Sequence, residues 1–186
     1  NTVTLKSQYS ERYRHMKSKH IKNLVLAALF AAAVFVATMC LQFPIPVAGY
    51  VNAGDIFVLS GAFFLGPVWG FFAGAIGSML SDLILGYGVY APATFIIKGL
   101  MAVVFALVCR SIVKEGAGAL RVLRVTLAAV LAEVVMVGGY FLFETLLYGT
   151  TTSLASLPFN CVQGAVGIVG SSVIVSVLQV NKPVMK

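Results

Sequence analysis

The sequence has little charge. Only 10% of its 186 residues are Asp, Glu, Lys or Arg, whereas 60% are apolar, and the mean hydropathy is +0.98. Ordinary soluble domains have about 25% charged residues and about 45–50% apolar ones. So few charged side chains cannot cover the surface of a soluble globule of this size. The composition therefore predicts a membrane protein.

The chain is also too short for a second domain. A spanning helix needs about 20 apolar residues, so six spans would use about 120 of them. The remaining tails and loops leave no room for a soluble ATPase, and the sequence contains no P-loop, dinucleotide-binding or zinc-ribbon pattern. We expect one membrane domain.

Histidine and cysteine are scarce where metal or covalent chemistry would need them. His15 and His20 lie in the basic N-terminal segment, and the three cysteines are far apart on apolar segments. No spacing suits a metal ion, no histidine lies in a predicted span, and Asp55 and Asp82 carry no protease-like motif. We expect no metal, no cofactor and no catalytic residue, which makes an intramembrane enzyme the least favoured function.

Apolar runs separated by proline, glycine and polar residues predict an all-α bundle of six transmembrane helices. The expected spans are 23–41, 54–66, 67–83, 93–109, 125–148 and 158–180. The second and third are separated at Gly66-Pro67, because proline is favoured in the first turn of a helix. Residues 1–22 are expected to form a basic tail or a surface helix, 23–181 the transmembrane domain and 182–186 a C-terminal tail.

Lysine and arginine are absent from three predicted loops, 42–53, 84–92 and 149–157. Of the 13 basic residues, six precede the first span, four separate the fourth from the fifth and two follow the sixth. Basic residues mark the cytoplasmic side of a membrane protein. Both termini are therefore expected in the cytoplasm, and the positive charge indicates orientation and not nucleic-acid binding. The remaining cation, Lys98, falls inside the fourth span.

Polar residues within the spans gather near their outer ends. Ionisable groups are costly in a bilayer and are therefore candidates for function. The predicted substrate-binding residues are Asn52, Asp55, Asp82, Tyr87, Tyr90, Lys98, Tyr140, Glu144, Asn160 and Gln163. The inner halves of the spans are almost entirely apolar, which disfavours a channel or a proton relay. The distribution predicts a cup that opens to the outside and is closed below.

Each of these residues also has a purely structural interpretation. Lys98 could only neutralise Asp82 or Asp55, the two acids could cap helix ends, and the two amides could bind loop backbone. The tyrosines could belong to the aromatic belt of the membrane interface, or they could stack on a flat heteroaromatic ligand. Glu133 lies near the middle of the fifth span, and this position favours a structural role or a contact with a partner subunit.

The first span carries a stripe of small residues. Ala28 and Ala32 are four positions apart, as are Ala33 and Ala37. Small residues at this spacing let helix backbones approach closely in lipid. The stripe predicts either packing within the bundle or docking of another membrane subunit.

Three blocks of sequence add a more specific indication. They are Gly54-Asp55 with LSGAFFLGP at 59–67, the segment 81–100 from Ser81-Asp82-Leu83 to Lys98-Gly99-Leu100, and Pro158-Phe159-Asn160 with Gln163-Gly164. With the six short spans, the outward cup and the alanine stripe, they resemble the substrate-binding S components of energy-coupling factor (ECF) vitamin transporters. The closest resemblance is to the riboflavin-transporter-type S-component family.

The resemblance implies a non-enzymatic, multi-pass subunit of a cell membrane, expected to be a bacterial plasma membrane, that binds one vitamin under the first external loop, 42–53. It implies assembly with a transmembrane coupling protein and two cytoplasmic ATPases, with Ala28 and Ala32 facing the coupling helices. A pyridoxine-like or hydroxymethylpyrimidine-like vitamin is favoured over riboflavin, because the outer loops have few aromatic residues besides tyrosine. The alternative is a stand-alone facilitator or small-molecule channel.

Overall fold

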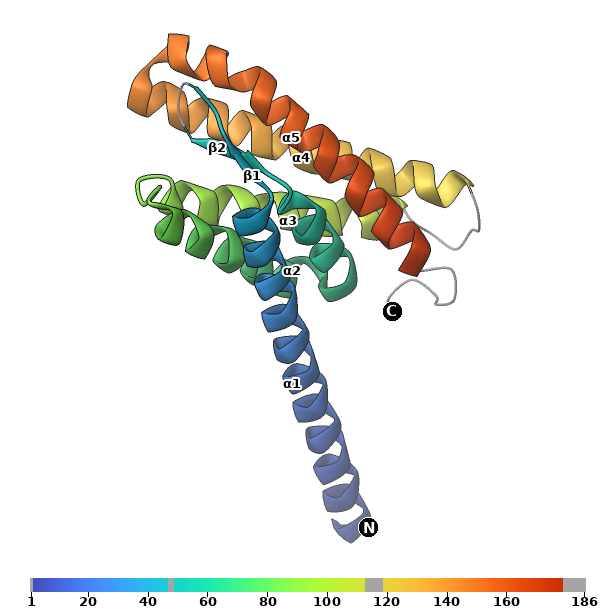
Figure 1. Ribbon diagram of the computed structural model, residues 1–186. Coiled ribbons are helices and arrows are strands. Elements are labelled where there is room, and N and C mark those ends of the chain that lie inside the picture. The colour runs from blue at the N-terminus through green and yellow to red at the C-terminus, as the bar shows by residue number, and fades with distance from the viewer. Residues whose placement is uncertain (1, 47–48, 113–118, 179–186) are drawn as a thin grey trace.

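Five helices and one short β-hairpin form the described part of the chain (Figure 1). They are α1 (Thr2–Cys40), β1 (Gln42–Pro44), β2 (Tyr50–Asn52), α2 (Asp55–Leu85), α3 (Ala91–Ile112), α4 (Ala119–Tyr148) and α5 (Thr150–Leu178). The structure is a computed structural model that describes residues 2–46, 49–112 and 119–178, with only the helical backbone given for 2–17, 19 and 119. The predicted tail 182–186 lies outside these residues. Each helix contains a stretch long and apolar enough to cross a membrane, so the predicted all-α membrane fold is confirmed.

The number of helices differs from the prediction, because the expected spans 54–66 and 67–83 belong to one helix, α2. At Gly66 the backbone leaves the helical region, with φ 80° and ψ −177°, and Pro67 follows. A Cβ atom added to Gly70 would lie 2.7 Å from Cα of Ala62, and one added to Gly74 would lie 2.8 Å from Cγ1 of Val58. These contacts are symmetric about Gly66, so α2 doubles back as a helical hairpin (Figure 1).

The first limb of this hairpin does not cross a bilayer by itself. Residues 55–66 rise only about 18 Å at 1.5 Å per residue, whereas the hydrocarbon core is about 30 Å thick. The predicted break at Gly66-Pro67 is the point where the chain reverses, and glycines 66, 70 and 74 let the two limbs pack directly against each other.

Helix α1 is longer than the predicted first span. The basic segment before residue 23 is helical and continues α1 in a straight line away from the bundle (Figure 1). The remaining part of α1 packs against α2, which packs in turn against α3, while α4 packs against α5. The main core between them is formed by fully buried apolar side chains such as Val34, Leu59, Met101, Phe105 and Met136.

The strands β1 and β2 form an antiparallel hairpin between α1 and α2, with Phe43 opposite Val51. The hairpin lies at the end of the bundle where α2 meets α3 and α4 meets α5 (Figure 1). Tyr50 and Asn52 are two positions apart on β2, so their side chains share one face of the strand. This hairpin brings polar groups from the loop 42–53 over the bundle.

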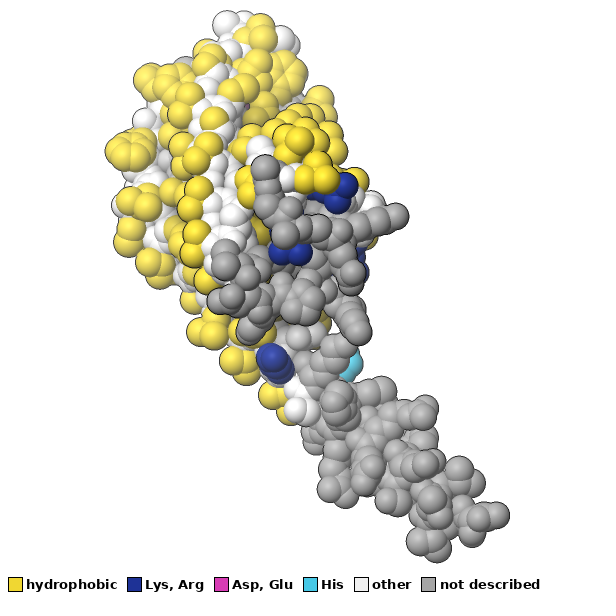
Figure 2. Space-filling model, turned by 90° about the vertical axis from the view of Figure 1, so that its right-hand side faces the viewer, with side chains coloured by type: hydrophobic (Ala, Val, Ile, Leu, Met, Phe, Trp, Pro, Cys, Tyr) yellow, Lys and Arg dark blue, Asp and Glu magenta, His cyan; other side chains and the backbone are white. Residues whose placement is uncertain are grey.

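Basic side chains gather at the other end of the molecule. Figure 2 shows Lys and Arg groups on that face. Among the residues whose side chains are described, the basic ones outside the bundle interior are Lys22, Arg110, Arg121 and Arg124. The separation of charge along the sequence is thus also a separation in space.

The bend of α2 predicts a specific sensitivity to substitution. Gly66→Ala should destabilise the protein by about 2–3 kcal/mol, because its backbone conformation is essentially restricted to glycine and a Cβ atom would collide with the guanidinium of Arg110. Gly86→Ala is the matched control: Gly86 also has a positive φ of 85°, but a Cβ atom there would meet open space, so its cost should be about 1 kcal/mol. Thermal unfolding in detergent compares the two, and equal melting temperatures would contradict the packing at the bend.

Candidate substrate-binding site

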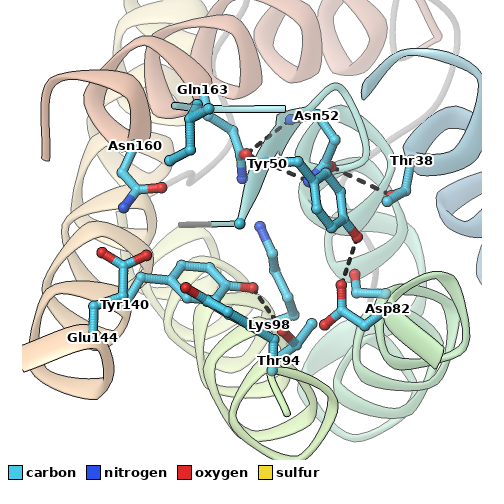
Figure 3. Close-up of a pocket in the computed structure, with 14 residues that line it drawn as sticks. Thr38, Tyr50, Asn52, Asp82, Thr94, Lys98, Tyr140, Glu144, Asn160 and Gln163 are labelled. Carbon is cyan, nitrogen blue, oxygen red and sulfur yellow. Dashed lines mark hydrogen bonds between the residues drawn. The ribbon is translucent and has the colours of Figure 1, made fainter. Parts of the chain in front are cut away.

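A polar cavity lies beneath the β-hairpin, enclosed by side chains from α1 to α5 (Figure 3). The residues that line it are Thr38, Ile45, Gly49, Tyr50, Asn52, Ser78, Asp82, Tyr90, Thr94, Lys98, Tyr140, Glu144, Asn160 and Gln163. Eight of the ten predicted binding residues are among them. The other two, Asp55 and Tyr87, contact lining residues from behind.

Asp55 connects the floor of the cavity to three other elements. Its Oδ1 atom accepts a hydrogen bond from Nζ of Lys98 in an ion pair whose side chains are only 1% and 2% exposed. Its Oδ2 atom accepts a hydrogen bond from Nε2 of Gln163 at 2.7 Å. A buried carboxylate needs such partners, because an unpaired charge is very costly away from water. Lys98 therefore neutralises Asp55, as one of the structural interpretations predicts, while its side chain also lines the cavity.

Hydrogen bonds of Tyr50 and Asn52 attach the hairpin to the bundle. The amide N–H of Asn52 donates to Oε1 of Gln163 at 2.9 Å, and Oγ1 of Thr38 donates to Oδ1 of Asn52 at 3.3 Å. The phenol of Tyr50 donates to Oδ1 of Asp82 at 2.5 Å. Burial and the neighbouring Asp82 carboxylate raise the pKa of the Tyr50 phenol, so Tyr50 stays protonated and remains the donor at neutral pH.

Tyrosines form one wall of the cavity and its outer edge. Tyr90 lies at the centre of this group of tyrosines. Its ring centroid is 6.3 Å from that of Tyr87, 6.5 Å from that of Tyr140 and 6.3 Å from that of Tyr148. Burial and the nearby Glu144 raise the pKa of the Tyr90 phenol, so this group is also neutral. Tyr90 and Tyr140 line the cavity and can stack on a ligand ring. Tyr87 instead packs behind Tyr50, with ring centroids 4.8 Å apart.

Four buried polar atoms of the lining residues have no hydrogen-bond partner among the residues that the structure describes. They are Oδ2 of Asp82, the hydroxyl of Tyr90, Oε2 of Glu144 and Nδ2 of Asn160. Leaving a buried polar group unpaired costs about 1–3 kcal/mol, so a polar ligand that satisfied these atoms would recover part of that cost. Two carboxylate oxygens can accept hydrogen bonds, and the amide of Asn160 can donate one.

Comparison with known proteins identifies the family to which this chain belongs. Residues 18–180 match the model of the family described as "ECF-type riboflavin transporter, S component". The chain belongs to this family. The resemblance drawn from the three sequence blocks is therefore confirmed, as is the expectation of a non-enzymatic, multi-pass subunit of the plasma membrane.

Two curated relatives and one solved structure are similar to this S component. It is 31% identical over 163 residues, covering 86% of this chain and 89% of the relative, to the thiamine precursor transporter HmpT of Lactococcus lactis subsp. cremoris. It is 38% identical over 138 residues, or 74% of this chain and 88% of the relative, to an uncharacterized protein of Pyrococcus woesei. A structure titled "Structure and mechanism of the S component of a bacterial ECF transporter" superimposes with a TM-score of 0.65 over 88% of this chain and 99% of that chain. At 23% identity, that likeness shows the common fold.

Sequence reasoning missed several residues of the S component's cavity, and two of them carried a usable signal. Tyr50 lies two positions before Asn52 on the same face of a strand. Thr94 lies one helical turn before Lys98, and its hydroxyl is 3.0 Å from that of Tyr140. Thr38 and Ser78 carried no such signal, because their position depends on how α1 packs against α2.

Glu133 is not among the lining residues. Its side chain lies between α4 and the glycines of α5: a Cβ atom added to Gly164 would be 3.4 Å from Cβ of Glu133. Both of its carboxylate oxygens are buried and lack a partner among the described residues. Its carboxylate lies beside Asp55, beneath the floor of the cavity: a Cβ atom added to Gly167 would meet Oε1 of Glu133 and would lie 3.0 Å from Cβ of Asp55.

The two alanines predicted to meet a partner lie on the outer side of α1. Ala28 and Ala32 are exposed, whereas Ala27 and Ala37 are buried in the bundle. The exposed pair lines an apolar groove together with residues of the second limb of α2, including Trp69 and Phe72. The two alanines that pack within the bundle are thus different members of the stripe from the two that are predicted to meet a partner.

The ion pair at the floor predicts a large stability effect that its charge balance can reverse. Lys98→Met should destabilise the protein by about 3–5 kcal/mol, because it leaves the Asp55 carboxylate buried without its cation. Adding Asp55→Asn should restore a substantial part of the loss, since the second substitution removes the unpaired charge. Unfolding in detergent measures the stability of both variants. A Lys98→Met protein as stable as the wild type would show that the ion pair does not hold the floor together.

Proposed function

We propose that this S component captures a small aminopyrimidine, of the hydroxymethylpyrimidine type, from the outer side of the membrane. The observation that carries the proposal is the set of unpaired atoms in the cavity. Figure 3 shows the amide of Asn160 and the carboxylate of Glu144 on one side of the cavity and Asp82 on the other. An aminopyrimidine presents an amino donor beside a ring-nitrogen acceptor, so it can bind an acceptor and a donor on the same side. The similarity to HmpT, a thiamine precursor transporter, supports the same ligand class.

The narrowness of the cavity favours a small ligand over a large one. Its free volume is about 20 Å³, which is room for about one water molecule. Any vitamin ring therefore requires the hairpin and the tyrosines to move outward, and a tricyclic flavin requires much more movement than a single ring. A pyridoxine-like vitamin is the second candidate, because it has a ring of similar size but no amino group for the carboxylates.

The topology supports binding from the outside. Because α2 doubles back at Gly66, it returns to the side of the membrane where it starts, and the other four helices are an even number of crossings, so both ends of the chain fall on one side of the membrane. The basic side chains of Figure 2 lie at the end opposite the cavity, and basic residues favour the cytoplasm. Both termini are then cytoplasmic, and the cavity under residues 42–53 faces outward.

The groove between α1 and α2 is the proposed contact with the transmembrane coupling protein. Ala28 and Ala32 form its floor, and apolar side chains of the second α2 limb form its far wall. Small residues on an exposed transmembrane face allow close helix packing. Since the chain contains no nucleotide-binding motif, the energy for uptake comes from two cytoplasmic ATPases bound to that coupling protein.

Ligand contact by Asn160 is tested by calorimetry with purified protein and hydroxymethylpyrimidine. Asn160→Ala should lower affinity about tenfold, the equivalent of one hydrogen bond of about 1.4 kcal/mol. Thr151→Ala, an exposed position nine residues earlier on α5, is the control and should bind normally. Mass spectrometry of ligand released from the wild-type protein identifies the vitamin directly. Release of riboflavin, or full affinity in the Asn160 variant, would argue against the proposal.

Docking in the groove is tested by placing large side chains at its two alanines. Ala28→Trp with Ala32→Trp should block co-purification with the coupling protein and abolish ATP-dependent uptake, because two indole rings prevent close approach of a partner helix. Vitamin binding should be retained, and Val173→Trp, on an exposed face of α5, should assemble normally. An intact complex carrying both tryptophans would exclude this groove, and uptake by the S component alone would favour a stand-alone facilitator.

A further inference from the structure

The cavity of this S component has an unusual balance of charge. Of the six acidic residues in the chain, four lie inside the membrane domain: Asp55, Asp82, Glu133 and Glu144. Each of the four is at most 3% exposed. The described part of the domain has one buried cation to set against them, Lys98, and that cation is already paired with Asp55.

No basic residue is available elsewhere near the mouth of the cavity. The segments 42–53, 84–92 and 149–157 contain no Lys or Arg at any position. The described basic side chains other than Lys98 lie at the opposite end of the molecule (Figure 2). A negatively charged ligand would therefore meet carboxylates without any free cation to compensate them.

Two of the carboxylates face the space that a ligand would occupy. Asp82 and Glu144 both line the cavity, and Figure 3 shows them on opposite sides of it. Each has one oxygen without a partner among the described residues. A phosphate group carries nearly two negative charges near neutral pH, and in a site of low dielectric its repulsion by these carboxylates is poorly screened.

We propose that Asp82 and Glu144 exclude phosphorylated forms of the vitamin, so that this S component captures only the free alcohol. This inference rests on the proposed function, because it assumes a hydroxymethyl-bearing ring as the ligand. It has a consequence for the order of reactions outside the membrane. A phosphate monoester must lose its phosphate by hydrolysis before it can be captured.

The test compares three ligands on the intact wild-type protein by calorimetry: hydroxymethylpyrimidine, its phosphate ester and its acetate ester. The acetate ester adds bulk at the same oxygen but no charge. The phosphate ester should bind at least about 100-fold more weakly than the alcohol, as expected for like charges in a poorly screened site. The acetate ester should bind much less weakly than the phosphate ester. Equal losses for the two esters would show that size, and not charge, causes the exclusion.

Neutralising variants identify the residues responsible. Glu144→Gln and Asp82→Asn should each narrow the preference for alcohol over phosphate ester by about tenfold. Glu133→Gln removes a carboxylate that lies beside Asp55 beneath the floor but does not line the cavity, so it should narrow the preference less than either of these variants. Equal effects of all three would mean that net charge and not position is decisive, which would overturn the assignment. Failure of the alcohol itself to bind would instead refute the proposed function, so the two failures are distinguishable.

Discussion

The ion pair and hydrogen bonds of the Asp55 carboxylate hold the outer half of this S component together. Asp55 lies at the start of α2 and is bound by Lys98 from α3 and by Gln163 from α5. The carbonyl of the same Gln163 accepts the backbone N–H of Asn52 from β2. Because a buried charge cannot lose its partners without a large penalty, these four elements are constrained to meet at one point. The floor of the cavity is therefore held together by contacts within the protein itself.

The polar groups above this floor have a different role. Those of Asp55, Lys98 and Gln163 satisfy one another, whereas Asp82, Glu144 and Asn160 each keep an unpaired atom beside the cavity. A floor whose polar groups are hydrogen-bonded to one another and a wall with unpaired polar atoms suit binding and release of a ligand. Below the floor, the core consists of apolar side chains such as Met101 and Phe105, which give ions or protons no continuous polar path. This agrees with the proposal that inward movement of the ligand requires partner subunits.

Much of the site could be predicted because depth in a membrane follows from position along an apolar run. Counting residues from the predicted span ends places Asn160, Gln163 and Glu144 at one level, and all three line the cavity. For α2 the sequence indicates the break at Gly66-Pro67, but it does not reveal that the first limb is too short to span or that the two limbs pack through glycine. Counting also fails for Thr38, which lines the cavity only because α1 packs against the hairpin and α2.

The sequence by itself determined the class of protein, the segregation of basic residues to one end and the level at which each polar group lies. These properties depend on composition and on distance along the chain. Only the tertiary structure decided which polar groups are paired and which remain free to bind. Pairing depends on lateral packing between helices, and the decisive contacts join residues 43, 108 and 111 positions apart. Hydropathy contains no information about such neighbours, so Lys98 could be recognised as part of the floor only after α2, α3 and α5 were brought together.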